Sequence, residues 1–283
     1  MKRANLGKRG GKKNQLFFED LFTDDEDCTG SSYGSTLRSA SCAAVAVVGG
    51  DRHSAADREP RISPPRTEAQ RAYHVALQGP SSIVVCCGPA GSGKTLSACE
   101  YAVKWLEDGR FRRVILVRPA VSTEDLGYLP GTVLEKLDPY LRPMYDVFEA
   151  FYEKKQFAAL IERGVVEPCA LAYCRGRTFK HALVIADEMQ NATPEQLKML
   201  ITRLGTGSKL VVTGDLRQHD QAYGKVNGLH DFIERWEAYS AQREDAPLIE
   251  IVRFARADIQ RHPVLEHVLR AYEDGPAGVG VGL

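Results

Sequence analysis

The stretch of sequence that decides the fold is Ile83-Val84-Val85-Cys86-Cys87 followed by Gly88-Pro89-Ala90-Gly91-Ser92-Gly93-Lys94-Thr95. The apolar run has the length and the β-branched residues of a buried strand, and residues 96–105 continue with helical periodicity. Residues 88–95 match the pattern G-x-x-x-x-G-K-[ST] in full. A glycine-rich loop between a strand and a helix can cradle phosphate groups, because its N–H groups and the helix N-terminus both attract anions.

The residue types of this loop fit a nucleoside triphosphate with magnesium. The glycines let backbone N–H groups turn inward, Lys94 can reach the β- and γ-phosphates, and the Thr95 hydroxyl can ligate Mg²⁺. The alternative is a glycine-rich turn that merely connects a strand to a helix, but the full motif in this context argues against it. We therefore predict that ATP and Mg²⁺ are bound by Gly88, Pro89, Ala90, Gly91, Ser92, Gly93, Lys94 and Thr95.

Strand and helix patterns alternate along the rest of the chain. Further apolar runs of strand length occupy residues 114–117, 183–186, 210–213 and 248–252. Segments of helical periodicity occupy residues 95–108, 133–152, 194–204, 229–239 and 263–272. The apolar runs lack strict alternation, which is typical of strands buried on both faces of a parallel sheet. The sequence predicts an α/β, three-layer P-loop (RecA-like) domain with a mostly parallel sheet and ligands at the carboxyl ends of its strands.

The composition of the chain changes near residue 62. A basic, glycine-containing start is followed by acidic clusters within residues 19–27 and by a Ser/Gly/Ala-rich stretch up to residue 50. Such composition rarely buries enough apolar area to offset chain entropy. We expect a disordered extension over residues 1–62, the P-loop domain over residues 63–274 and a flexible tail over residues 275–283. The basic start is a solvated tail, a nucleic-acid contact or a nuclear-import signal.

Bulk properties argue against several classes of protein. The 37 basic and 37 acidic residues balance, so the chain does not coat nucleic acid by charge alone, although a local basic groove stays open. The seven cysteines show no C-x-x-C pair or zinc-site spacing, which fits free thiols in a reducing compartment. No apolar stretch approaches the roughly 20 residues that span a bilayer, and no apolar region follows the first three residues. We expect a cytoplasmic protein without membrane contact.

Two carboxylates end the apolar strand that leads to Ala186. Asp187 at the strand end can hold magnesium directly or through water, and Glu188 can polarise the attacking water. A small-molecule kinase uses its substrate as the nucleophile and does not need the second carboxylate, so the pair favours hydrolysis. Thr193 then fits the N-cap of a helix, with Gln196 completing a capping box, better than it fits a glycosylation acceptor.

A third polar turn follows the strand at residues 210–213. Here the sequence continues as Gly214-Asp215-Leu216-Arg217-Gln218. On a strand next to the first two, the Gln218 amide would lie near the γ-phosphate, where it could sense hydrolysis. The alternative is an ordinary exit from a strand into a loop. This turn is a weak signal by itself. It becomes a strong one because it follows the other two elements in order and at suitable spacing.

Together these elements resemble the PhoH-like proteins, a branch of ATPases related to superfamily 1 helicases. The resemblance covers residues 64–273 and rests on Thr67-Glu68-Ala69-Gln70, Val117-Arg118-Pro119-Ala120, residues 125–131, residues 175–179, residues 187–191, Gly214-Asp215 with Gln218, and Arg253-Phe254 with residues 258–263. The sequence departs from the family pattern at Met189, usually an alanine, and at residues 219–221, which are usually more apolar. No ribonuclease domain precedes the core as in some relatives, so the resemblance does not imply nuclease activity.

The resemblance implies roles for residues outside the three motifs. Gln70 would read the edge of the adenine base with its amide, or else is an exposed glutamine on a helix. Arg177 and Arg261 would stabilise charge on the γ-phosphate, either within the chain or across a subunit interface. For both arginines a structural salt bridge is the alternative.

The resemblance also implies a nucleic-acid partner. Arg118, with Ser122 and Thr123 in the loop after it, would lie where related helicases contact the nucleic-acid backbone. The leading hypothesis is an ATPase coupled to single-stranded RNA or DNA, with Lys94 and magnesium neutralising charge and Glu188 as the base. Superfamily 1 helicases normally use two RecA-like domains and this chain has room for one. We therefore predict a homo-oligomeric ring, of which a hexamer is one form.

Two other functions stay open at this stage. A nucleotide-dependent switch or binding module would hydrolyse ATP slowly and would not need stimulation by RNA. A P-loop metabolite kinase would explain the glycine-rich loop alone. It would explain neither Glu188 nor the turn at residues 214–218.

Overall fold

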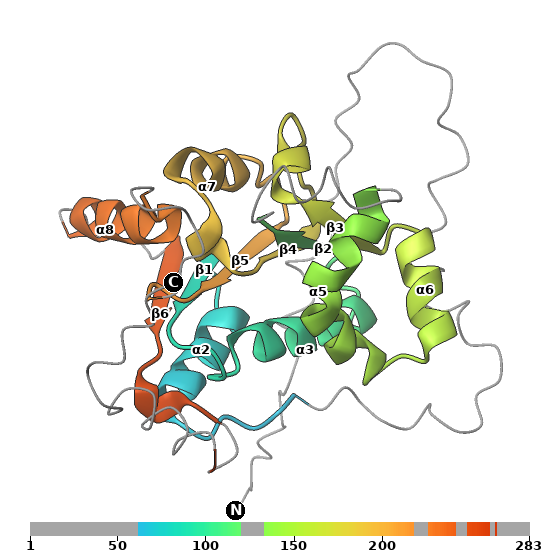
Figure 1. Ribbon diagram of the computed structural model, residues 1–283, viewed down its shortest axis with the longest axis horizontal. Coiled ribbons are helices and arrows are strands. Elements are labelled where there is room, and N and C mark those ends of the chain that lie inside the picture. Colours follow the sequence, from blue (N-terminus) through green and yellow to red (C-terminus); the bar gives the residue numbers. More distant parts are fainter. Residues whose placement is uncertain (1–61, 120–132, 218–225, 242–247, 261–263, 265–283) are drawn as a thin grey trace, which may run out of the picture. The chain divides into compact units, whose positions relative to one another are not determined.

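The computed structural model describes residues 62–119, 133–217, 226–241, 248–260 and 264. These residues form a six-stranded sheet in the order β3-β2-β4-β5-β1-β6, with helices on both faces (Figure 1). Every pair of neighbouring strands is parallel. The predicted α/β, three-layer architecture with a parallel sheet is confirmed. Residues 1–61 and 265–283, where we expect an extension and a tail, lie outside the described residues.

Five of the six strands are those that the sequence predicts. The strands are β1 (Ile83–Cys87), β2 (Arg113–Arg118), β3 (Val166–Ala170), β4 (Ala182–Ala186), β5 (Lys209–Gly214) and β6 (Ile249–Arg253). The sequence pattern does not predict β3, because Glu167 and Pro168 interrupt its apolar run. A proline is tolerated there because β3 is an edge strand, where one side makes no ladder of hydrogen bonds.

Four of the helices lie where the sequence predicts them, and two, over residues 68–78 and 154–162, are not predicted. The helices are α2 (Glu68–Gln78), α3 (Lys94–Glu107), α5 (Val133–Glu149), α6 (Lys154–Glu162), α7 (Pro194–Ile201) and α8 (Gly228–Ser240), with short 3₁₀ turns η1 (Leu171–Cys174), η2 (Met189–Asn191) and η3 (Arg256–Asp258). Helix α7 begins at the predicted cap, where the Thr193 side chain accepts the Gln196 N–H at 3.3 Å. The helix predicted at residues 263–272 lies outside the described residues apart from Val264.

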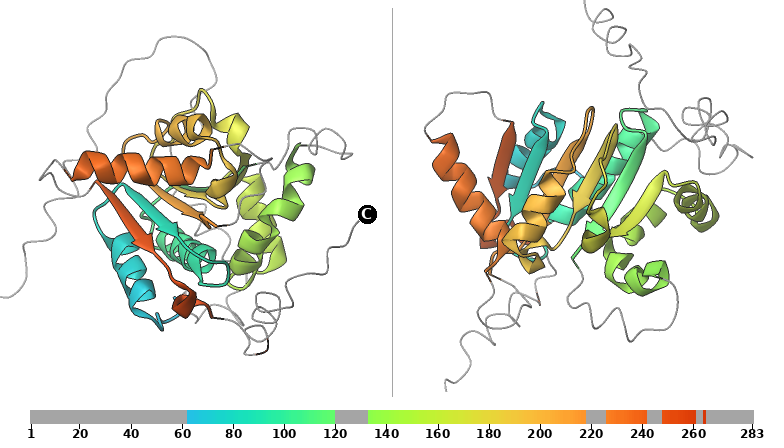
Figure 2. Two further views of the ribbon diagram at one scale, coloured as in Figure 1. Left: turned by 60° about the vertical axis from the view of Figure 1, so that its left-hand side comes forward. Right: turned by 90° about the horizontal axis from the view of Figure 1, so that it is seen from above.

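Alternate residues of the central strands pack against two helical layers. On one face, Val84 and Cys86 join the core that α2, α3, α5 and α6 cover. On the other face, Val85 and Cys87 join the core that α7 and α8 cover (Figure 2). All residues of β1 and β4 are buried, and each fully buried aliphatic side chain contributes roughly 1.5–3 kcal/mol. This burial fixes the carboxyl ends of β4, β5 and β1 side by side.

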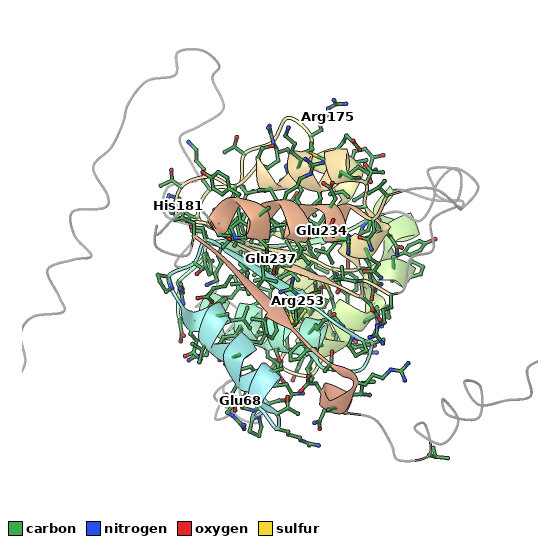
Figure 3. The ribbon with its side chains drawn as sticks, turned by 90° about the vertical axis from the view of Figure 1, so that its left-hand side faces the viewer. Glu68, Arg175, His181, Glu234, Glu237 and Arg253 are labelled. Carbon is green, nitrogen blue, oxygen red and sulfur yellow. The ribbon has the colours of Figure 1, made fainter. Side chains whose placement is uncertain are left out.

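The sheet edge at β6 is tied to both helical layers. Arg253 Nη2 lies 2.5 Å from Glu237 Oε1 of α8 (Figure 3). Phe254, directly after the strand, meets Tyr73 of α2 edge to face with 5.9 Å between ring centres. Of the helices within the described ranges, none combines the length and the apolar character needed to cross a lipid bilayer.

Candidate active site

The loop after β1 is shaped by glycine backbones. Gly88, Gly91 and Gly93 have φ angles of +151°, +84° and +89°, a region that other residues rarely adopt. At Gly88 a side chain would also collide, because a Cβ atom would lie 2.6 Å from Cβ of Phe254. Gly93 is the N-cap of α3, so the helix N-terminus, with N–H groups that are not used within the helix, adjoins the loop. The loop therefore has the backbone that an anion cradle requires.

Lys94 is buried and lies over its own loop. Its Nζ donates to the carbonyl groups of Gly88 and Pro89, each at 2.8 Å. The Ser92 hydroxyl donates to the same Pro89 carbonyl at 2.8 Å. Within the part of the chain that the structure describes, Lys94 forms no ion pair. Its ammonium can therefore exchange these carbonyls for phosphate oxygens without giving up a charged partner.

Two hydroxyl groups meet at the Asp187 carboxylate. Thr95 Oγ1 donates to Asp187 Oδ1 at 2.8 Å, and Thr213 Oγ1 donates to the same oxygen at 2.5 Å. Asp187 is 2% exposed, and its N–H donates to the Val117 carbonyl of β2. Hydroxyl and carboxylate oxygens are hard ligands of the kind that Mg²⁺ prefers, so this set fits the ion. The structure brings together the predicted Thr95 and Asp187, and it adds Thr213, which the sequence does not predict.

Glu188 occupies a strained backbone position directly after Asp187. Its φ and ψ angles are +57° and +37°, and a non-glycine residue in this left-handed region costs of order 1–3 kcal/mol. The turn gives the adjacent carboxylates different surroundings. Asp187 meets Thr95 and Thr213, whereas the Glu188 side chain is 39% exposed. One carboxylate can thus serve as a ligand while the other faces water.

Arg118, at the end of β2, contacts both carboxylates. Its Nη2 lies 3.3 Å from Asp187 Oδ2 and 3.4 Å from Glu188 Oε1, and its side chain is 17% exposed. Its Nη1 donates to the Tyr140 carbonyl of α5. The sequence suggests a nucleic-acid contact for this residue, but the structure places its guanidinium against the paired carboxylates. Residues 122–123, which share that expectation, lie outside the described residues.

Gln190 is a site residue that sequence reasoning misses. Its side chain is 2% exposed, its Nε2 donates to Glu188 Oε2 at 2.5 Å, and its Oε1 accepts the Asp215 N–H at 3.1 Å. A Cβ atom on Gly214 would lie 2.7 Å from Gln190 Oε1, so the glycine makes room for the amide. The amide joins the exits of β4 and β5. A polar residue two positions after Glu188 in a buried turn is the signal that points to it.

Gln70 connects the start of α2 to the glycine-rich loop. Its Nε2 donates to the Ser92 carbonyl at 3.1 Å, and its Oε1 accepts the Arg66 N–H at 2.8 Å. A second link comes from the segment after η3, where the Gln260 N–H donates to the Gly91 carbonyl at 2.9 Å. The Gln70 amide is therefore tied to the loop backbone. Its recognition of adenine stays a prediction.

Arg177 has a carboxylate partner within the chain. Its Nη1 lies 2.5 Å from Glu167 Oε1, its Nη2 lies 2.9 Å from Oε2, and its guanidinium lies 5.1 Å from the centre of the Phe179 ring. These partners hold it beside the edge strand β3, from which β1 and its loop are separated by β2, β4 and β5. These contacts support the alternative of a structural salt bridge for Arg177. A role across a subunit interface stays a prediction. Gln218 and Arg261 lie outside the described residues.

Cavity size alone would favour a different place on the molecule. A groove of about 680 Å³ lies between α7 and α8, whereas the hollow that borders Gly88 and Pro89 measures about 130 Å³. The groove is lined by apolar and ring side chains and by charged groups that pair with one another, such as Asp231 and Arg235 at 2.8 Å. We place the candidate site at the loop, because the lysine, the hydroxyls and the carboxylates gather there.

The comparison with known families agrees with the motifs. The family model described as "PhoH-like protein" matches residues 62–273. The chain belongs to the PhoH-like protein family. The resemblance drawn from residues 64–273 of the sequence is therefore confirmed.

Curated relatives carry the same family name. A PhoH-like protein of Synechocystis sp. is 43% identical over 209 residues, which cover 74% of this chain and 61% of the relative. A PhoH-like protein of Bacillus subtilis is 37% identical over 264 residues, covering 93% of this chain and 72% of the relative. Protein PhoH of Escherichia coli is 40% identical over 210 residues, covering 73% and 57%. The chain spans less than two thirds of the Synechocystis and Escherichia coli proteins.

Solved structures give weaker likenesses. The Sulfolobus solfataricus SWI2/SNF2 ATPase core in complex with dsDNA matches with a TM-score of 0.43 and 12% identity, over 80% of this chain and 57% of that chain. A structure of two coordinating Pif1 helicases at forked dsDNA matches with a TM-score of 0.31 and 18% identity, over 74% and 48%. At these scores neither likeness bears on the function of the PhoH-like chain.

Proposed function

We propose that this PhoH-like chain binds ATP with Mg²⁺ at residues 88–95 and hydrolyses the terminal phosphate. The observation that carries the proposal is the cluster of Thr95, Thr213 and Asp187 beside Glu188. The cluster lies where the carboxyl ends of β1, β5 and β4 adjoin, which is the edge of a parallel sheet where ligands bind.

In this proposal, different residues of the chain have different roles in the reaction. Lys94 leaves the carbonyl groups of its loop and neutralises oxygens of the β- and γ-phosphates. Thr95 and Asp187 would hold Mg²⁺, which when bound would supply positive charge against the charge that develops on the phosphates. Glu188 would orient a water molecule and accept its proton as the water oxygen bonds to the γ-phosphorus, while the bond from that phosphorus to the bridging oxygen breaks and ADP leaves. The second carboxylate thus has a task that a metabolite kinase would not need.

The contacts of Glu188 favour a slow switch as the second candidate function. Arg118 lies against one carboxylate oxygen and Gln190 donates to the other. The carboxylate must weaken one of these contacts before it takes a proton from water. A chain in this arrangement would hydrolyse ATP slowly until a partner moves Arg118.

The partner that we propose is single-stranded RNA or DNA, with a neighbouring copy of the chain completing the site in a homo-oligomeric ring. Support comes from the resemblance to helicase-related ATPases and from the open side of the site, where Gly91 is exposed. A hexamer is one form of such a ring. Gln218 and Arg261, from the same chain or from its neighbour, and Arg177 from a neighbouring chain are the candidates for completing the site.

The test is steady-state phosphate release from ATP and magnesium, with and without single-stranded RNA. We expect Lys94→Ala and Glu188→Gln each to lower the rate by roughly 10²–10³, as the loss of one preorganised group does. The matched controls are Lys104→Ala, a lysine of the same helix that pairs with Asp108, and Glu195→Gln, an exposed carboxylate in the first turn of α7. Both controls should keep the native rate.

The outcomes separate the candidates. Hydrolysis that RNA stimulates and that both site variants lose would support a coupled ATPase. Hydrolysis that is slow and indifferent to RNA would favour the switch. If neither variant differs from its control, the residues do not catalyse the reaction and the proposal fails.

A further inference from the structure

Two buried thiols lie together beside β3, outside the site described above. Cys169 belongs to β3 and Cys174 ends η1, and their Sγ atoms are 3.7 Å apart. A disulfide requires an Sγ–Sγ distance of about 2.05 Å, so a shift of less than 2 Å would join them. We propose that Cys169 and Cys174 are a redox modification site, and that hydrogen peroxide converts them to a reversible intrachain disulfide.

The surroundings distinguish the two thiols chemically. Arg177 Nη1 donates to Cys169 Sγ at 3.5 Å, while the same guanidinium pairs with Glu167. The hydrogen bond from Cys174, together with the charge of Arg177, lowers the pKa of Cys169 against the effect of burial. The same hydrogen bond and burial raise the pKa of Cys174. Cys169 therefore carries the nucleophilic thiolate and Cys174 keeps its proton until it resolves the intermediate.

The pair lies just beneath the surface. Cys174 is itself buried, but its neighbours Tyr173 and Arg175 are exposed, Tyr173 to 56%. Figure 3 shows Arg175 projecting from the outer side of the molecule. Cys169 is 5% exposed. A small opening of this one turn admits a molecule the size of hydrogen peroxide.

The reaction balances with peroxide as the oxidant. The Cys169 thiolate attacks one peroxide oxygen, the O–O bond breaks, and the departing hydroxide takes up a proton to leave as water. The resulting Cys169 sulfenic acid is attacked by Cys174 sulfur, which loses its proton as the S–S bond forms and a second water leaves. Two thiols are oxidised by two electrons, and one peroxide is reduced to two waters. A dithiol reductant reverses the bond by exchange.

The test uses the full chain and reads the bond directly. After peroxide treatment the protein is denatured, alkylated with iodoacetamide and cut with trypsin, which releases residues 164–175 as one peptide holding both cysteines and no other. We expect this peptide to be lighter by two hydrogen atoms than the reduced, unalkylated peptide, and to take up iodoacetamide only after dithiothreitol. The internal controls are Cys86, Cys87 and Cys99, which are also buried and free. These three cysteines should take up iodoacetamide without dithiothreitol.

Variants test the roles of the individual groups. In Cys174→Ser, Cys169 should accumulate as a sulfenic acid that dimedone traps, whereas Cys99→Ser should form the disulfide as the native chain does. Arg177→Gln should slow the reaction, because loss of the guanidinium charge raises the pKa of Cys169 and lowers its thiolate fraction.

The proposal is independent of ATP hydrolysis, since no readout involves the glycine-rich loop. It is overturned if peroxide leaves both cysteines open to alkylation, or if the other three buried cysteines oxidise equally fast. A disulfide that links separate chains would also overturn it.

Discussion

Strand β5 carries buried polar side chains at both of its ends, Lys209 at the amino end and Thr213 at the carboxyl end. Lys209 is 3% exposed, and its Nζ donates to the carbonyl groups of Gly79 at 2.9 Å and Ala76 at 3.2 Å. These carbonyls end helix α2, which has no basic residue in its own last turn. The ammonium therefore satisfies acceptors that the helix leaves over and opposes the negative end of its dipole.

At the carboxyl end of β5 the partners are side chains from helix α3 and from the turn that follows β4. Thr213 and Thr95 both donate to one oxygen of Asp187, and Gln190 connects the next turn to Glu188 in its strained conformation. Backbone carbonyls complete the hydrogen bonding of Lys209, whereas the groups at the other end gather around a carboxylate that fits a cation. The comparison teaches that burial of a polar group does not mark a site by itself. Convergence on one ionisable atom beside a strained backbone does.

The strongest test of this difference between the two ends of β5 is Asp187→Asn, for which we expect the largest effect. The change keeps the size of the side chain and removes the charge that Thr95, Thr213 and Arg118 surround. We expect magnesium-dependent phosphate release to fall by roughly 10²–10³. The urea midpoint should move little, because the amide oxygen still accepts a hydroxyl hydrogen.

The matched control is Asp146→Asn on α5, where Arg142 is the partner at 2.7 Å. It should change neither rate nor midpoint measurably, because an exposed pair contributes about 0–1 kcal/mol. If both variants keep the native rate, Asp187 is a structural acceptor like the carbonyls around Lys209.

A smaller effect is expected at Gln190, which positions Glu188 and does not contact the phosphates in our proposal. Gln190→Ala should lower kcat about 10–100-fold, since a misplaced group can cost that much, while KM for ATP stays within about twofold. The control is Gln78→Ala in α2, which removes an amide that donates to Tyr101 Oη of α3 at 2.7 Å. It should lower the free energy of unfolding and leave kcat unchanged. Equal effects of the two variants on kcat would mean that Gln190 is part of the packing alone.

Much of the site could be predicted from the sequence because its chemistry is local. Residues 88–95 must provide a glycine backbone, a lysine and a hydroxyl within one turn, and Asp187 with Glu188 must end one strand. The order of strands is not local, and for this reason the contact of Thr213 with Asp187 could not be predicted. Gln190 follows Glu188 by two positions, but its link to the Asp215 N–H also depends on that order.

Arg118 and β3 are two further features that the sequence pattern alone does not predict correctly. The sequence suggests a nucleic-acid contact for Arg118, but β2 pairs with β4 so that Val117 lies opposite Ala186, and the guanidinium reaches the carboxylates that follow. Strand β3 forms although Pro168 breaks its pattern, because Val166 and Cys169 are buried under the neighbouring helices and the strand needs only one partner. Tertiary context decides both outcomes.

At the other end of β5 we expect a change of stability without a change of activity. Lys209→Met keeps the apolar stem but leaves the Gly79 and Ala76 carbonyls without this donor. The free energy of unfolding should fall by roughly 1–3 kcal/mol, the cost of unsatisfied buried acceptors, while phosphate release per folded chain stays native. Urea unfolding combined with the hydrolysis assay measures both. A loss of activity at full stability would contradict the comparison.

The same lysine also makes this stability difference depend on pH. Burial lowers the pKa of Lys209 from its ordinary 10.5 to about 8, the charge of Arg110 acts in the same direction, and Glu250 opposes it. Between these two values the unfolded chain binds a proton that the folded chain does not, so this lysine makes the free energy of unfolding rise with pH. Other titrating groups are common to the native chain and Lys209→Met and cancel in the difference. The advantage of the native chain over the variant should therefore grow as pH rises from 8 toward 10.5, as followed by urea unfolding. A difference that stays flat or shrinks would mean that the ammonium remains charged in the folded chain, and that its two carbonyl partners hold the proton more strongly than burial removes it.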